Sequence, residues 1–209
     1  MDRCGAFAAR APKSDRLLDT NTYLRLAKRI RPLLGVTFGQ KKYVLTVLKD
    51  VENEMRRSRA LSYQFPWFDT EEFGAERDAA ILRLTATEKA ALASAESVLR
   101  GYVLTEVNRY TTGGRHPPSP TDCRVLAFSQ VREAIVVTDD LGMHLLAQDF
   151  ETPIWHGWEL LDKMRSAKMV SNELVREIYE AMERNGDLTR TWADAKHTTF
   201  ARVFGGKPG

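Results

Sequence analysis

Six acidic side chains stand at positions where distant segments of the chain could bring them together. Some directly follow short apolar runs, where strands are expected to end, and the others lie in the first turns of expected helices. They come from four stretches that are far apart in the sequence. These residues are Asp19, Glu52, Glu54, Asp122, Asp139 and Asp140.

A cluster of carboxylates has a definite chemical consequence. Carboxylates packed closely repel one another, and some take up protons at neutral pH unless a cation lies among them. Ligand sets made only of oxygen suit hard cations such as Mg²⁺ or Mn²⁺, which bind few carboxylates and keep part of their water shell. One or two such ions can activate water and stabilise an in-line attack on a phosphodiester. The acids therefore indicate metal-dependent phosphodiester hydrolysis.

Alternation of short apolar runs with longer helical segments predicts the α/β fold that would position these acids. We expect buried strands at about 16–18, 43–47, 134–137 and 153–155, with helices following them. Such alternation is typical of a mostly parallel sheet with right-handed crossovers. Ligands of such sheets bind beyond the carboxyl ends of the strands. Because several of the acids follow strand ends, we expect them to share one edge of the sheet.

Each acid also has a simpler interpretation. An Asp that follows a strand or opens a helix is often only a helix cap, whose side chain accepts hydrogen bonds from the first backbone N–H groups. The coincidence of four such segments, rather than any single acid, favours a site.

Composition excludes several other classes of protein. The 209 residues are 43% hydrophobic and 28% charged, which is enough to bury a core and is not typical of a disordered chain. No apolar run approaches the ~20 residues of a membrane span, and the N-terminus lacks the apolar segment of a secretory signal. The two cysteines, Cys4 and Cys123, cannot form a disulfide framework. We therefore expect a cytoplasmic protein with no membrane association.

Positive charge is concentrated in the N-terminal quarter of the chain. The formal net charge is +3, but residues 10–60 hold 13 Lys and Arg against 5 Asp and Glu. Such a basic region could bind a polyanion such as RNA, although solvated helix faces explain it equally well. The candidate phosphate contacts that flank the second acidic stretch are Lys41, Lys42, Arg56 and Arg57.

Four motifs together resemble the acidic motifs of the PIN-domain family. Their order and the eighteen-residue spacing from Asp122 to Asp140 are similar to that family, and the resemblance covers about residues 14–165. The motifs read LLDTNTYL at 17–24, VENEM at 51–55, PTDCRVLA at 120–127 and IVVTDD at 135–140.

This resemblance implies a three-layer α/β fold, in which helices flank a central, mostly parallel sheet, and a Mg²⁺- or Mn²⁺-dependent endoribonuclease. A metal-activated water would attack phosphorus and leave a 5′-phosphate and a 3′-hydroxyl. The implied metal ligands and catalytic residues are Asp19, Glu54, Asp122 and Asp140, with Glu52 as the rival of Glu54 and Asp139 as the rival of Asp140. The implied supporting residues are Asn21, Thr138 and Asp139.

The family includes VapC-like toxins of type II toxin–antitoxin pairs, so the resemblance also implies an RNA substrate, an antitoxin partner and a homodimer. The chain departs from the compact toxins in having a helical insertion at about 65–110 and a long segment after Asp140. We therefore expect a PIN-like domain over 14–165 and a helical extension and tail over 166–209. The alternatives are a non-catalytic protein- or RNA-binding module on the same scaffold, and a structure-specific DNA nuclease.

Overall fold

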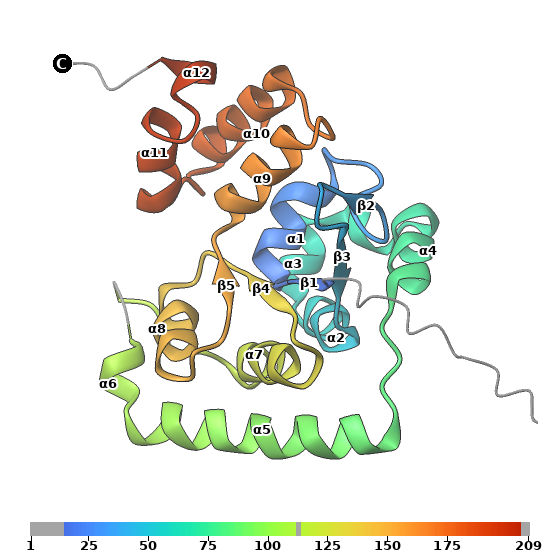
Figure 1. Cartoon of the computed structure of the whole chain (residues 1–209), viewed down its shortest axis with the longest axis vertical. Helices are drawn as coiled ribbons and strands as arrows, with labels where there is room; N and C mark the ends of the chain where they lie inside the picture. Colours follow the sequence, from blue (N-terminus) through green and yellow to red (C-terminus); the bar gives the residue numbers. More distant parts are fainter. Residues whose placement is uncertain (1–14, 112–113, 206–209) are drawn as a thin grey trace, which may run out of the picture.

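A five-stranded sheet lies at the centre of the computed structural model, which describes residues 15–111 and 114–205 (Figure 1). The strand order is β2-β3-β1-β4-β5. Strands β3, β1, β4 and β5 run parallel to one another, and β2 is antiparallel to β3. The strands are β1 (Asp15–Leu18), β2 (Thr37–Phe38), β3 (Tyr43–Val47), β4 (Ile135–Val137) and β5 (Ile154–Trp155). The expectation of an α/β fold with a mostly parallel sheet is confirmed.

Helices cover both faces of this sheet. Figure 1 shows α1, α9 and α10 on one side, with α11 and α12 beyond them, and α5, α7 and α8 on the other. The helices are α1 (Thr20–Ala27), α2 (Lys49–Arg57), α3 (Arg59–Gln64), the 3₁₀ helix η1 (Pro66–Asp69), α4 (Glu71–Ala80), α5 (Ala86–Thr105), α6 (Val107–Tyr110), α7 (Pro120–Arg132), α8 (Leu141–Asp149), α9 (Gly157–Ser166), α10 (Asn172–Asn185), α11 (Arg190–His197) and α12 (Ala201–Phe204). None of these helices combines the length and the apolar character needed to cross a bilayer.

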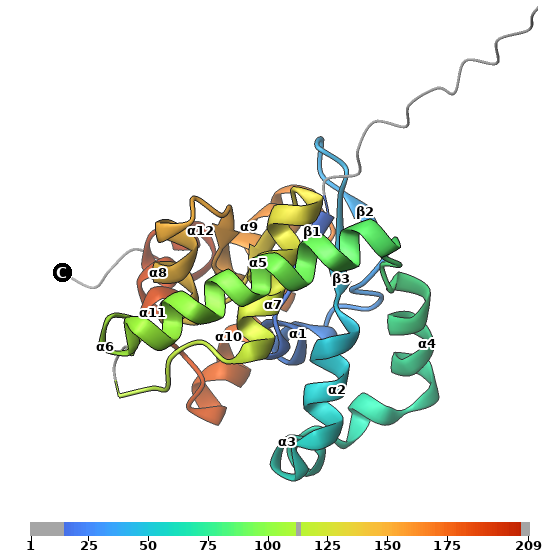
Figure 2. The ribbon, with the colours of Figure 1, turned by 90° about the horizontal axis from the view of Figure 1, so that it is seen from below.

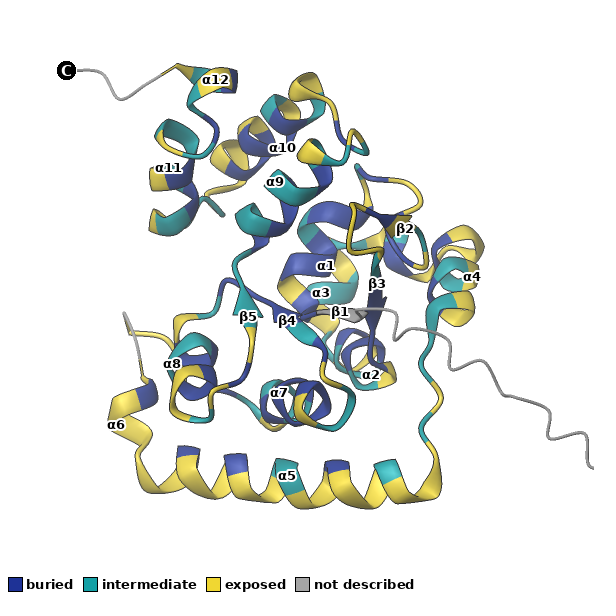
Figure 3. Cartoon of the chain, in the orientation of Figure 1, coloured by how far each residue is buried: buried dark blue, intermediate teal, exposed yellow. Residues whose placement is uncertain are grey.

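Two hydrophobic cores form, one on each face, because successive strand residues point to opposite sides. Within β4, Val136 packs into the core shared with α5, α7 and α8, whereas Val137 packs into the core shared with α1, α9 and α10. Helix α5 crosses the whole of its face in Figure 2, and Figure 3 shows that it buries its inner side and exposes its outer side. Both faces of the central strands are therefore buried, as parallel sheets require.

The ends of three strands are level at one edge of the sheet. Leu18 of β1 pairs in register with Val47 of β3 and with Val137 of β4, and each of these residues ends its strand. Strand β1 lies between β3 and β4. The connections from β1 to β3 and from β3 to β4 therefore lead to opposite sides of β1. This is the switch point at which open parallel sheets form their ligand crevices. The residue that follows β1 is Asp19 and the one that follows β4 is Thr138.

The C-terminal segment packs against the sheet domain. Residues of α10, α11 and α12 belong to the same core as Leu18 and Val137, and Trp192 of α11 is fully buried in it. Helices α11 and α12 are absent from the elements expected from the sequence, as is the two-residue strand β2. Within the insertion, Phe68 of the 3₁₀ helix η1 is buried against the ring of Tyr23.

Candidate active site

Asp19 is the buried acid at the centre of the edge. One carboxylate oxygen caps α1 by accepting the backbone N–H of Thr22 at 2.7 Å, and the other accepts the hydroxyl of Thr138 at 2.5 Å. Burial raises the pKa of Asp19 to about 7, although the hydrogen bonds from Thr138 and Thr22 lower it and the charge of Asp139 adds a further increase. A buried carboxylate with a raised pKa and two fixed donors is typical of a functional site.

Glu54 reaches the same edge from α2. The hydroxyl of Thr20, the residue next to Asp19, donates to the Glu54 carboxylate at 2.6 Å. This contact fastens α2 to the first turn of α1 and places the second predicted acid beside the first.

Asp122 faces Glu54 and Asp140 from the start of α7. Its carboxylate accepts the backbone N–H of Ser119 at 2.7 Å, and the Ser119 hydroxyl in turn accepts the Asp122 N–H, so the pair forms a capping box. Burial raises the pKa of Asp122 to about 6, and the negative charges of Glu54 and Asp140 raise it further. Asp122 therefore lies in the field of two other predicted ligands.

Asp140 completes the group through Thr138. It caps α8 by accepting the N–H of Met143 at 2.9 Å, and its own N–H donates to the Thr138 hydroxyl at 3.1 Å. The Thr138 hydroxyl thus touches Asp19 and Asp140 at once. The structure brings the four predicted ligands to one edge of the sheet. This acidic edge consists of Asp19, Glu54, Asp122 and Asp140.

The acidic edge does not form a ready-made metal cage. Within residues 15–111 and 114–205, no three His, Cys, Asp or Glu side chains converge closely enough to hold a metal ion. Three of the four acids use a carboxylate oxygen as a helix cap, as the simpler interpretation of the sequence expected.

Asp139, the rival of Asp140, points into the core. Its carboxylate accepts hydrogen bonds from Arg25 at 2.7 Å, from the Trp192 indole at 2.8 Å and from the Gly157 N–H at 3.0 Å. Burial opposes the charge, but the nearby His156, the charge of Arg25 and these bonds outweigh it and hold the pKa of Asp139 below its usual value. Asp139 therefore links β4 to α1, α9 and α11.

Glu52, the rival of Glu54, also faces away from the acidic edge. It forms ion pairs with Lys49, Arg56 and the buried Arg77. Burial opposes its charge, yet the contact with Lys49 and the charges of Lys49, Arg56 and Arg77 together lower the pKa of Glu52. Glu54, rather than Glu52, shares the edge with Asp122.

The predicted basic contacts separate into two groups. Lys41 and Lys42 are exposed in the turn before β3, so the whole strand separates them from the acidic edge. Arg56 turns toward Glu52 and Asp69.

Arg57 lies nearer the acids, and a polar cavity of about 330 Å³ is lined by both Arg57 and Glu54. Asn21, which was expected to support the ligands, is exposed and contributes to a different pocket. Of the basic residues predicted from the sequence, Arg57 is therefore the one placed beside an acid of the edge.

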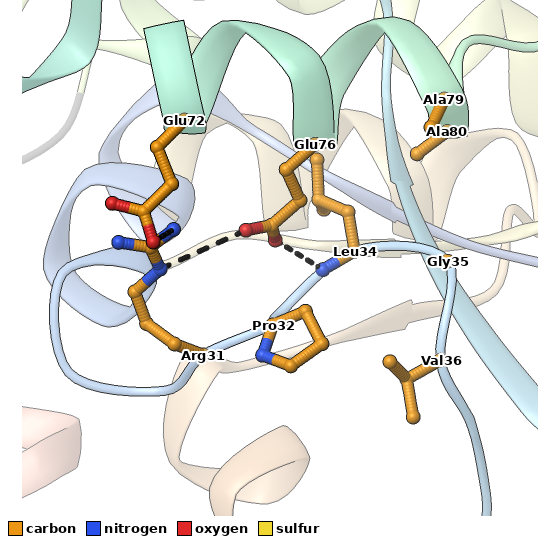
Figure 4. Close-up of a pocket in the computed structure, with 9 residues that line it drawn as sticks. All are labelled: Arg31, Pro32, Leu34, Gly35, Val36, Glu72, Glu76, Ala79 and Ala80. Atoms are coloured by element: carbon orange, nitrogen blue, oxygen red, sulfur yellow. Dashed lines mark hydrogen bonds and ion pairs between the residues drawn. The ribbon is translucent and has the colours of Figure 1, made fainter. Parts of the chain in front are cut away.

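A larger cavity of about 660 Å³ lies between the segment after α1 and helix α4 (Figure 4). The carboxylate of Glu76 in this cavity accepts hydrogen bonds from the backbone N–H groups of Leu33 and Leu34 and forms an ion pair with Arg31. These contacts hold the segment after α1 against α4. This cavity shares no lining residue with the acidic edge.

Comparisons with known proteins show one weak likeness. No protein-family model matches the sequence, and no curated protein matches it. A chain in the crystal structure of FitAcB from Neisseria gonorrhoeae is 15% identical, with a TM-score of 0.42, and the match covers 68% of this chain and 98% of that one. At this identity and TM-score, the similarity does not establish a common fold.

Proposed function

We propose that this protein is a Mg²⁺- or Mn²⁺-dependent endoribonuclease with a PIN-like fold. The observation that carries the proposal is the position of Asp122, whose pKa is raised by burial and by the negative charges of Glu54 and Asp140. Asp19 joins this group through Thr20 and Thr138. Four acids from four distant segments thus lie along the same edge of a parallel sheet, at its switch point.

The chemistry of these side chains fits a hydrated hard cation. All four ligands are carboxylates, and in each helix-capping acid only one oxygen takes part in the cap; the second oxygen of Asp19 accepts the Thr138 hydroxyl. Mg²⁺ needs only one or two carboxylates because it keeps several waters, so the absence of a convergent trio among the described residues is compatible with it. A cation would favour the charged forms of Asp19 and Asp122, which burial disfavours. When bound, the ion would supply Lewis acidity toward water and the phosphate.

The residues of the chain have separate roles in this proposal. Asp19, Glu54, Asp122 and Asp140 hold the ion and keep the edge negative. Thr138 and Thr20 fix the carboxylates of Asp19 and Glu54 by hydrogen bonds, which orients them as supporting residues do in metal sites. Asp139 positions the loop that carries Asp140 by binding Arg25 and Trp192.

Cleavage of labelled single-stranded RNA in Mg²⁺ or Mn²⁺ tests the proposal. We expect Asp19→Asn to abolish cleavage while circular dichroism shows an intact fold, and we expect EDTA to abolish it in the wild type. Asp162→Asn is the matched control, because Asp162 pairs with Arg165 on α9 and takes no part in the acidic edge. Cleavage that survives both Asp19→Asn and EDTA would falsify the mechanism.

The substrate is tested in the same assay. Flap DNA, duplex RNA and single-stranded RNA are compared at equal concentration. Faster cleavage of flap DNA would show that the protein is a DNA nuclease and not a ribonuclease. Absence of any heat or thermal shift with Mn²⁺ would favour a non-catalytic binding module. The antitoxin partner and the homodimer remain predictions from the sequence resemblance.

A further inference from the structure

A second pocket lies between α1, α3 and α10. It has a volume of about 150 Å³ and receives residues from all three helices. Asn21 on its wall directly follows Thr20, whose hydroxyl binds Glu54. Arg25, one turn further along α1, also lines the pocket and pairs with Asp139. Helix α1, which Asp19 caps at its N-terminus, therefore connects the pocket to the acidic edge.

The wall of the pocket combines apolar and polar surface in similar amounts. Leu24 of α1, Leu61 of α3 and Met182 of α10 contribute aliphatic surface, and the ring of Phe65 follows α3. Small-ligand sites likewise combine apolar surface with polar groups that fix the orientation of the ligand. Bases of single-stranded RNA commonly stack on aromatic or apolar side chains of proteins.

The polar groups of the pocket are of two kinds. Gln64 at the end of α3 and Asn185 at the end of α10 bring side-chain amides, and Asp187 brings a carboxylate just beyond the C-cap Gly186. These three side chains form no hydrogen bond with the described part of the chain. Amides and a carboxylate can read the donor and acceptor groups on a base edge.

Arg29 supplies positive charge at the α1 side of the pocket. Its guanidinium contacts the backbone oxygen of Arg25 at 3.4 Å and forms no ion pair with the carboxylates of residues 15–111 and 114–205. Asp187 lies next to the C-terminus of α10, whose dipole disfavours anions. The pocket thus offers both a cation for a phosphate and acceptors for a base.

We propose that this pocket is a subsite for one nucleotide of a single-stranded RNA substrate. Arg29 binds a backbone phosphate, Leu61 and Phe65 pack against the base, and Asp187 with Asn185 accepts hydrogen bonds from its edge. Helix α10 completes the subsite, which assigns a function to the C-terminal extension. A base held in a duplex cannot enter so narrow a cavity. This inference rests on the proposed nuclease function and extends it to substrate binding.

Fluorescence anisotropy of a labelled eight-nucleotide single-stranded RNA, measured in EDTA with the full chain, tests the subsite without cleavage. We expect Arg29→Gln to weaken binding at least severalfold and to lower the slope of log K against log salt by about 0.7, as loss of one phosphate contact in single-stranded RNA predicts. Asp187→Asn should change the order of affinity among oligonucleotides that differ at one base. Arg190→Gln is the matched control, because it removes one arginine from an exposed position on α11 outside the pocket.

The outcomes separate the subsite from the nuclease. If Arg29→Gln and Asp187→Asn bind every oligonucleotide as the wild type does, or if duplex RNA binds as tightly as the single strand, the subsite is wrong even where metal-dependent cleavage occurs. If both variants change binding as expected and no metal-dependent cleavage is found, the subsite is supported and the proposed nuclease function is wrong. Binding of inorganic phosphate alone with the affinity of the oligonucleotide would overturn the base-recognition part.

Discussion

The hydroxyl of Thr138 donates to the carboxylate of Asp19 at 2.5 Å, across 119 residues of sequence. The same oxygen accepts the N–H of Asp140. One small side chain at the end of β4 therefore holds together the acids that follow β1 and β4. The predictions below test this arrangement and the elements around it.

Removing the hydroxyl should weaken the acidic edge. We expect Thr138→Val to lower the free energy of unfolding by about 1–3 kcal/mol, because the buried Asp19 carboxylate and Asp140 N–H lose a partner. It should also reduce Mn²⁺ affinity in calorimetry. Thr138→Ser keeps the hydroxyl and should retain both properties more fully. Equal Mn²⁺ affinity in the valine and serine variants would contradict the role given to Thr138.

The two rival glutamates should behave in opposite ways. Glu52→Gln leaves the buried Arg77 without its carboxylate, so we expect a loss of about 3–5 kcal/mol in urea unfolding. Because Glu54 is partly exposed and contacts Thr20, Glu54→Gln should cost little stability but remove most metal-dependent cleavage. A folded Glu52→Gln variant that is as inactive as Glu54→Gln would reverse this assignment.

Trp192 should anchor the C-terminal helices through Asp139. Trp192→Phe removes the charge-assisted hydrogen bond at 2.8 Å while keeping most of the ring, and we expect a loss of about 1.5–3 kcal/mol. Trp158→Phe is the matched control, since the Trp158 indole N–H is buried without a partner in the described chain. Comparable destabilisation in both variants would show that ring packing, not the bond to Asp139, holds α11 in place.

Gly142 is required by close packing beside Asp140. A Cβ atom there would lie 2.7 Å from the Tyr110 carbonyl oxygen and 3.1 Å from an Asp140 carboxylate oxygen. We expect Gly142→Ala to cost about 1–3 kcal/mol and to slow cleavage roughly tenfold or more by displacing Asp140. Gly101→Ala, in open space on α5, is the control and should be neutral or stabilising. Wild-type cleavage by the Gly142 variant would argue against Asp140 as a ligand.

The contribution of Asp19 to stability without metal should fall as the pH rises from about 4 to about 7. The pKa of Asp19 is raised to about 7 in the fold, so in this window the folded chain holds more protons than the unfolded chain. Asp122, with a pKa of about 6, acts in the same direction. Asp19→Asn should therefore reduce the pH dependence of stability and raise the melting temperature at pH 7. A difference in melting temperature between Asp19→Asn and the wild type that does not grow in favour of the variant from pH 5 to pH 7 in EDTA would contradict the burial of the Asp19 charge.

Local sequence patterns predicted most of the elements that carry the site. The run 43–47 is the observed strand β3, and the strand before Asp19 and the helix after Ser119 begin or end within a residue or two of expectation. These features depend on apolar runs and capping residues, which act over a few neighbouring positions. The two-residue strand β2 was missed because so short a strand forms through pairing with β3 and has no pattern of its own.

Choosing between neighbouring acids needed the folded chain. Glu52 and Glu54 are two residues apart on one helix, so they point about 200° apart, and only the positions of Arg77 and Thr20 decide which face meets the edge. Asp139 and Asp140 are adjacent, and the partners that draw Asp139 inward, Arg25 and Trp192, lie 114 and 53 residues away.

The sequence by itself determined the alternation of strands and helices, the caps and the presence of acids after strand ends, because each depends on residues close together in the chain. The tertiary structure decided which acids share the edge, where the basic residues lie, and that α10 completes a pocket with α1 and α3. These are contacts between distant segments, and they exist only once the sheet has brought its strand ends level.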